Sequence, residues 1–136
     1  MKAVFDTNIF VSALAIPGGQ GQRAVELVIE GKVSLCISKQ IVHETLEVLA
    51  RKFARSPEEL SRTAVFLTDL AELVTRTLRL AVLSDEPDNR ILECAVAGHA
   101  DIIVTGDRAM LELNVYEGIR ILSLRRLLDE FEKPAS

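Results

Sequence analysis

Short, mostly apolar segments alternate with segments of helical periodicity along this chain of 136 residues. The apolar segments, each expected to be a strand, are residues 3–5, 33–37, 102–104 and 120–122. Strands that are apolar on both faces and separated by helices favour a parallel sheet that is covered on two sides. The chain is therefore predicted to be an α/β protein, with residues 1–136 forming one domain around one core.

Residues that typically begin or end helices indicate where the helices lie between these strands. One helix is expected from about residue 8 to 15, one to end at Gly31, one to begin at about residue 88, and the others to follow Ser38, the capping box Ser56–Glu59 and Ser123. The segment 73–83 is compatible with a helix end, a strand or a loop.

Two helices have apolar faces that can be read from their spacing. The face of the helix after Ser38 is expected to be Val42, Leu46, Leu49 and Phe53. The face of the next helix is expected to be Leu60, Ala64, Leu67 and Ala71, which would contact the core and could also serve a dimer.

Composition restricts the class of protein. Hydrophobic residues make up 49% of the chain and charged residues 26%, which is typical of a globular protein. No apolar run approaches the roughly 20 residues that a membrane span needs, and the charged N-terminus is unlike a signal peptide, so a cytoplasmic location is expected. Cys36 and Cys94 lie in apolar runs and are predicted to be buried, reduced thiols.

Three aspartates lie where a parallel sheet forms its sites. Asp6 ends the first strand, and Asp107 follows Val104 by three residues, so both belong to the carboxyl ends of strands. Asp88 shares a helix face with Leu92 and should therefore point toward the sheet. No Lys or Arg lies on that face, and an unpaired buried carboxylate is costly, so a bound cation would explain it.

Each acid also has an explanation that needs no metal. Asp6 and Asp107 could cap helices, Asp88 could interact with a helix dipole, and Glu44, which lies off the apolar face of its helix, could be a solvated surface residue. Glu93 is interpreted as a peripheral acid, and Asp85 and Glu86 as solvated turn residues.

The chemistry of these side chains favours a hard cation. Carboxylates suit Mg²⁺ or Mn²⁺, whereas His and Cys would favour zinc. The net charge of −4 argues against binding nucleic acid by bulk attraction, unless the acids cluster and a metal neutralises them.

Four segments in order resemble the motifs of PIN domains. They are Val4-Phe5-Asp6-Thr7-Asn8, His43-Glu44, Asp88-Asn89-Arg90-Ile91-Leu92-Glu93-Cys94-Ala95 and Val104-Thr105-Gly106-Asp107. The resemblance covers nearly the whole chain and is greatest to the prokaryotic PIN-family toxins of toxin–antitoxin pairs, with which Ser12-Ala13-Leu14, Pro17-Gly18-Gly19 and Gly118-Ile119-Arg120-Ile121-Leu122 also agree.

The resemblance implies a three-layer α/β/α sandwich with the four acids at one end of a central parallel sheet. It implies an endoribonuclease that depends on Mg²⁺ or Mn²⁺ and hydrolyses RNA. Asp6, Asp88 and Asp107 would bind the metal, and Glu44 would complete the catalytic cluster. The residues that would orient acids or waters around them are Asn8, Thr105 and Glu93.

Partners follow from the same resemblance. Basic residues should hold the RNA backbone at the rim of the acidic cleft, and the candidates, each of which could equally be an ordinary solvated charge, are Arg23, Arg51, Lys52, Arg55 and Arg108. A small antitoxin is expected to cover the cleft, and a homodimer or higher oligomer is expected.

Two other functions are compatible with parts of the sequence. A PIN module could act in RNA processing, or bind RNA or a protein without catalysis, although all four acids are present. A phosphoryl-transfer receiver domain is also acidic and binds magnesium. It would need paired acids at the end of the first strand and a Lys after the last, whereas Asp6 is followed by Thr7-Asn8.

Overall fold

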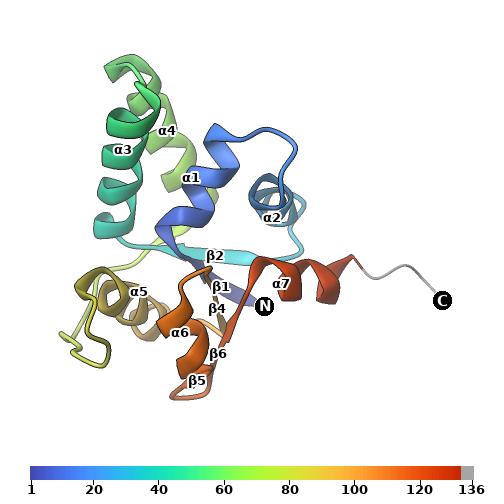
Figure 1. Ribbon diagram of the computed structural model, residues 1–136, viewed down its shortest axis with the longest axis vertical. Coiled ribbons are helices and arrows are strands. Elements are labelled where there is room, and N and C mark those ends of the chain that lie inside the picture. Colours follow the sequence, from blue (N-terminus) through green and yellow to red (C-terminus); the bar gives the residue numbers. More distant parts are fainter. Residues whose placement is uncertain (133–136) are drawn as a thin grey trace.

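The computed structural model describes residues 1–132, in which a six-stranded sheet lies between helices (Figure 1). The strands are β1 Lys2–Phe5, β2 Ser34–Ile37, β3 Glu72–Leu73, β4 Ile102–Val104, β5 Val115–Tyr116 and β6 Ile119–Leu122. The helices are α1 Thr7–Ala15, α2 Gln20–Ile29, α3 Lys39–Phe53, α4 Pro57–Leu70, α5 Glu86–Ala97, α6 Arg108–Leu113 and α7 Leu124–Phe131.

The strand order is β3-β2-β1-β4-β6-β5, with β1 between β2 and β4. All pairs are parallel except β5 and β6, which form an antiparallel hairpin. The two residues of its turn, Glu117 and Gly118, have φ angles of 49° and 82°, as tight hairpin turns require. The sheet is therefore mixed at one edge, where the sequence predicted only parallel pairing.

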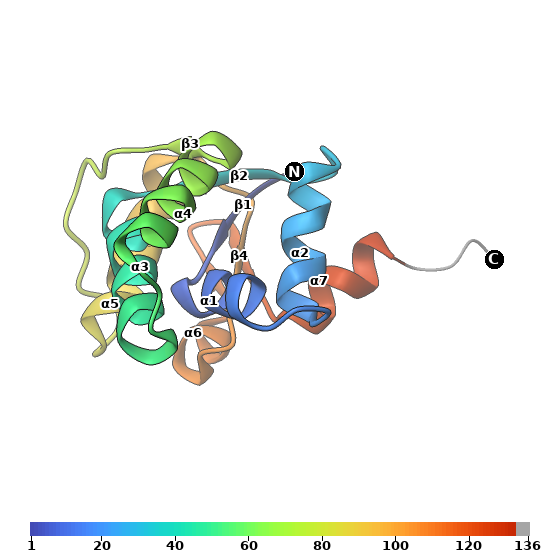
Figure 2. The ribbon, with the colours of Figure 1, turned by 90° about the horizontal axis from the view of Figure 1, so that it is seen from above.

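The central strands are buried on both faces, as predicted. The side chains of Ala3, Val4 and Phe5 in β1 have no exposed surface, and the same is true of all three residues of β4. Figure 1 shows α1 to α4 on one side of the sheet and α5 and α6 on the other, and Figure 2 shows α7 beside α2. The three-layer α/β/α sandwich is confirmed.

The predicted caps are confirmed, but the buried face of α3 differs from the prediction. The side chains of Ser38, Ser56 and Ser123 accept hydrogen bonds from the helices that they precede. The residues of α3 that are buried are Ile41, Thr45 and Leu49.

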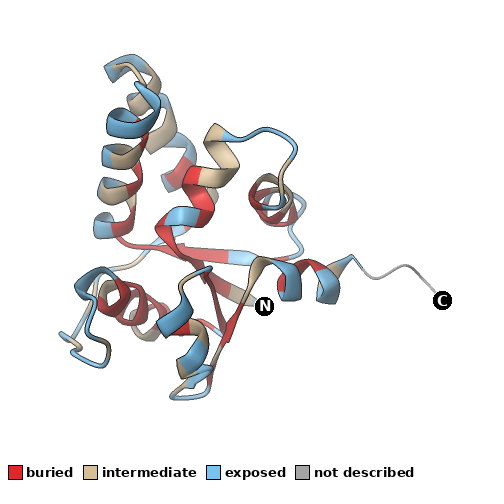
Figure 3. Ribbon diagram, in the orientation of Figure 1, coloured by how far each residue is buried: buried red, intermediate tan, exposed pale blue. Residues whose placement is uncertain are grey.

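Thr45 can occupy the core because its Oγ1 donates to the carbonyl of Ile41 at 2.8 Å, which leaves no unpaired hydroxyl. Phe53 is 40% exposed, since the end of α3 extends beyond the sheet (Figure 3). Of the apolar face predicted for α4, Leu67 and Ala71 are buried, whereas Leu60 and Ala64 are only half-buried.

Both cysteines are buried and free, as predicted. Gly98, which ends α5, packs directly against one of them, because a Cβ atom at this position would lie 2.6 Å from Cys36 Sγ. Burial raises the pKa of the Cys94 thiol to about 12. None of the helices in residues 1–132 has the length and apolar composition that crossing a membrane requires.

Candidate metal centre

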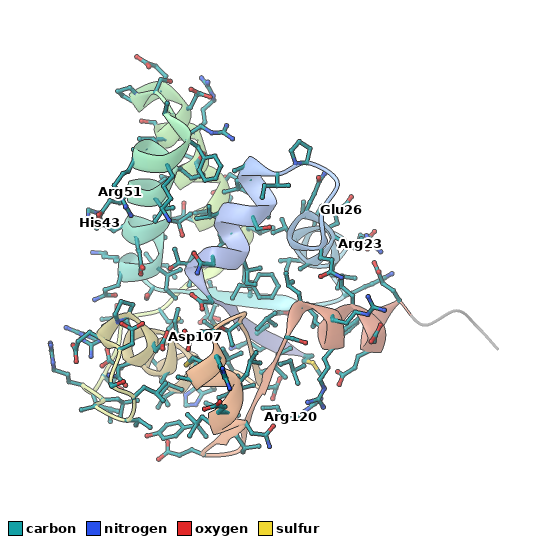
Figure 4. The ribbon with its side chains drawn as sticks, in the orientation of Figure 1. Arg23, Glu26, His43, Arg51, Asp107 and Arg120 are labelled. Carbon is teal, nitrogen blue, oxygen red and sulfur yellow. The ribbon has the colours of Figure 1, made fainter. Side chains whose placement is uncertain are left out.

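A cavity of about 400 Å³ lies beyond the carboxyl ends of β1 and β4. All four predicted acids line it, although they are far apart in the sequence. The lining residues are Asp6, Thr7, Asn8, Glu44, Asp85, Pro87, Asp88, Gly106, Asp107 and Arg108. Figure 4 labels Asp107 at the start of α6, near the middle of the molecule. The topology explains the convergence, since β1 and β4 are neighbours and Asp6 and Asp107 follow them.

Asp6 is held by Thr105 from the neighbouring strand end. Thr105 Oγ1 donates to Asp6 Oδ2 at 2.7 Å and accepts a hydrogen bond from the backbone N–H of Asp107 at 3.0 Å. The Asp6 side chain makes no capping hydrogen bond to α1. Burial raises the pKa of Asp6, and the charge of Asp107 adds to this effect.

Asp107 both caps a helix and belongs to the acidic cluster. Its Oδ2 accepts a hydrogen bond from the N–H of Met110 at 3.0 Å, which fixes the carboxylate at the start of α6. One oxygen from each of Asp85, Asp88 and Asp107 lies within 4.8 Å of one from each of the other two. The capping role and the predicted place in the cluster are therefore compatible.

Asp88 is the most constrained of these acids. It is 5% exposed, and within residues 1–132 its Oδ2 atom has no hydrogen-bond partner. Burial, followed by the adjacent Asp107, raises its pKa to about 7. A buried carboxylate oxygen without a donor is unfavourable unless a proton or a cation compensates it, which supports the reasoning from helix periodicity.

Glu44 reaches the cavity from the second turn of α3. Its Oε2 accepts a hydrogen bond from Thr7 Oγ1 at 3.3 Å. Burial raises its pKa, and the charges of Asp6 and Asp85 raise it further. Glu44 is half-buried, so its position off the apolar face of α3 aims it at the cavity and not into bulk solvent.

Asp85 is the lining acid that the sequence interpretation missed, because it was assigned to a solvated turn. It is the N-cap residue of α5, yet its side chain makes no capping hydrogen bond. Its spacing of three residues from Asp88 was the available signal, since residues at i and i+3 lie on the same side of a helix start.

Of the three predicted neighbouring residues, one lines the cavity, one contacts a lining acid and one lies elsewhere. Asn8 lines the cavity, and Thr105 contacts Asp6. Glu93 instead holds the loop before α5. Its side chain is 1% exposed, forms ion pairs with Arg76 and Arg90 at 3.0 Å each, and accepts the N–H of Leu80 at 2.8 Å.

Of the five predicted basic residues, only Arg108 lines the cavity. Arg23, on α2, contacts three glutamates, one of them Glu132, and Figure 4 shows it away from Asp107. Arg55 donates to the carbonyl of Leu14 at 3.0 Å. Arg51 and Lys52 are exposed in the last turn of α3, outside the cavity lining.

Three comparisons relate this chain to known proteins. A family model described as PIN domain matches residues 2–109. An uncharacterized protein of Methanocaldococcus jannaschii is 29% identical, with the alignment covering 98% of this chain and 93% of the relative. The crystal structure of VapBC2 from Rickettsia felis bound to a DNA fragment from their promoter is similar in fold, with a TM-score of 0.64, 15% identity, and coverage of 90% of this chain and 98% of that chain.

Proposed function

Because the chain belongs to the PIN domain family, we propose that it is an endoribonuclease that hydrolyses RNA phosphodiester bonds at the acidic cavity with Mg²⁺ or Mn²⁺. The observation that carries this proposal is the buried Asp88 carboxylate, whose Oδ2 has no partner within residues 1–132 and which lies beside Asp107 and Asp85. An electrostatic arrangement of this kind is stable when a cation occupies it.

The lining residues fit a hard divalent cation. The cavity lining within residues 1–132 offers carboxylate oxygens and contains neither His nor Cys, which favours Mg²⁺ or Mn²⁺ over zinc. Asp88 and Asp107 would hold the ion, with Asp6 bound directly or through water. The chemistry supplied by a bound ion would be activation of the attacking water and stabilisation of charge on the leaving oxygen.

The chain orients these acids before any substrate arrives. Thr105 fixes Asp6, and the first turn of α6 fixes Asp107. Thr7 binds Oε2 of Glu44, which leaves Oε1 to accept a proton from the attacking water. The raised pKa of Glu44 makes it a better proton acceptor than an ordinary carboxylate, as general-base catalysis requires.

Arg108 is placed to bind the RNA backbone at the rim. Its side chain is 93% exposed, and its only ion pair within residues 1–132 is with Glu112. An empty acidic cavity repels a polyanion, so the proposal requires that RNA and the divalent ion bind together.

An antitoxin partner is the second part of this proposal. The similarity in fold to a VapBC2 protein supports it, and so does the charge of the cavity. Five carboxylates at one opening are complementary to an arginine side chain, which could form bidentate hydrogen bonds with them. We therefore expect a small antitoxin to insert an arginine here and to block cleavage.

The nuclease is tested by incubating the purified protein with end-labelled single-stranded RNA and, in parallel, with DNA of the same sequence. We expect RNA cleavage with Mn²⁺ or Mg²⁺, none with EDTA, and a loss of at least about 100-fold in Asp107→Asn. Asp69→Asn, which changes an exposed acid on α4 outside the cavity lining in the same way, is the matched control and should retain activity. Equal cleavage by Asp107→Asn would identify a contaminating nuclease, and cleavage of DNA alone would contradict the assigned substrate.

The toxin is tested by controlled expression in a bacterial host. The wild-type chain should arrest growth, and Asp107→Asn, expressed at the same level, should not. Equal growth of the two strains would contradict the toxin and would leave the nuclease to be judged by the cleavage assay.

A further inference from the structure

We propose that Asp85 is an additional metal ligand, which completes an oxygen cluster with Asp88 and Asp107. This inference rests on the proposed function, because it concerns the same ion. Oxygens of the three carboxylates lie within 4.8 Å of one another, so one small cation can contact all three after slight rotation of the side chains.

The carboxylate of Asp85 has no competing role. Asp is a favoured N-cap residue because its side chain usually accepts a hydrogen bond from the first turn of the helix. At the start of α5 this bond is absent, and within residues 1–132 the Asp85 side chain forms neither a hydrogen bond nor an ion pair. The side chain is exposed and faces the cavity, so an ion entering from solvent would meet Asp85 before it reaches buried Asp88.

Independent evidence for a ligand comes from the buried end of the cluster. Asp88 Oδ2 has no donor, although Asp6, Glu44 and Asp107 each accept at least one hydrogen bond. A cation bound between Asp85 and Asp88 would satisfy this oxygen, whereas no donor in residues 1–132 does so.

The backbone that carries Asp85 is also fixed. The side chain of Asn89, which is completely buried, accepts the N–H groups of Val82 and Leu83 at 3.0 and 2.8 Å and donates to the carbonyl of Leu83 at 2.8 Å. These bonds hold the chain two residues before Asp85 against α5. Asp85 is therefore held in position, as an effective ligand must be.

The experiment is a Mn²⁺ titration of the full chain. Binding is measured by calorimetry and by the loss of the electron paramagnetic resonance signal of free Mn²⁺. The variants are Asp85→Asn, Asp107→Asn and Glu86→Gln. Glu86 is the matched control because it is adjacent and exposed and carries the same charge, but it does not line the cavity. Far-UV circular dichroism verifies that each variant is folded.

We expect Asp85→Asn to weaken Mn²⁺ binding at least about tenfold relative to Glu86→Gln. Equal affinities in these two variants, with binding lost in Asp107→Asn, would overturn the role of Asp85 and leave the proposed function intact. A wild-type chain that takes up no Mn²⁺, with or without an RNA oligonucleotide, would overturn both.

Discussion

At the scale of single residues, the acids that line the cavity differ in how their charge is compensated. Asp6 has a threonine donor and Asp107 a helix N-terminus, whereas one oxygen of Asp88 has neither within residues 1–132. The cost of keeping Asp88 charged in the metal-free protein is therefore the largest of the three.

The first prediction concerns Asp88→Asn in the absence of metal. Because the folded-state pKa of Asp88 is raised from 3.8 to about 7, the stability contributed by its protonated form is complete below pH 3.8 and is lost as the pH rises through 7. Asparagine does not ionise. The free energy of unfolding of the variant should therefore exceed that of the wild type by about 1–3 kcal/mol at pH 8 and equal it at pH 3.5. Urea unfolding in EDTA measures this, and a variant that is less stable at pH 8 would contradict the pKa.

The second prediction concerns Thr105→Val, which keeps the shape of the side chain but removes its hydroxyl. Asp6 Oδ2 then loses a donor and the N–H of Asp107 loses an acceptor, so we expect a loss of about 1–3 kcal/mol in unfolding free energy and a lower cleavage rate. Thr68→Val, at an exposed position on α4, is the control and should change stability by less than about 0.5 kcal/mol. Equal effects of the two substitutions would show that the Thr105 hydroxyl is dispensable.

The limits of the sequence prediction are also visible at this scale. Asp6 and Asp107 could be predicted because strand ends mark the site edge of a parallel sheet, and Asp88 because helix periodicity placed it inward. Glu44 was assigned only by resemblance, since it lies off the apolar face of α3. Asp85 was missed because a turn has no periodicity, and a cap residue that makes no capping bond is recognisable only in three dimensions.

At the scale of elements, the long strands and capped helices could be predicted, whereas two connections could not. The hairpin of β5 and β6 has only two residues in its first strand, which is too short to show alternation. The loop from Val74 to Leu83 follows no periodic pattern because side chains of α5 fix it, chiefly Asn89 and Glu93.

The third prediction concerns that loop. Asn89→Ala removes three hydrogen bonds to residues 82 and 83, and we expect it to destabilise the fold by about 2–4 kcal/mol. The amides of Val82 and Leu83 should exchange with deuterium faster than those of β1 and β4, because their acceptor is lost in the native state. A uniform acceleration over all strands, without an additional effect at 82 and 83, would contradict a local role.

At the scale of the whole molecule, the cavity lies between elements that are far apart in the sequence. They are the ends of β1 and β4, the second turn of α3 and the start of α5. An ion that binds all of these should stabilise the entire fold, since unfolding must release it.

The fourth prediction quantifies this coupling. Free Mn²⁺ at about 100 times its dissociation constant should add about 2.7 kcal/mol to the free energy of unfolding, which corresponds to several degrees in Tm. The increase should be smaller at pH 5 than at pH 8, because the raised pKa values of Asp6, Glu44 and Asp88 favour protons over the ion at low pH. Differential scanning calorimetry of the wild type and Asp107→Asn measures it, and an equal increase in both would point to ion binding elsewhere.

The reactivity of the two buried cysteines can be used to measure the stability of the protein. Cys36 is buried and packs against Gly98, and Cys94 is buried and has a thiol with a raised pKa. A maleimide or disulfide reagent should therefore modify only molecules that have opened. When reclosing is fast, the labelling rate follows the opening equilibrium. Ion binding at the acidic cavity should therefore slow the modification of the thiols. Labelling that proceeds at the rate of a free thiol would show that this part of the sheet is open to solvent in the native state.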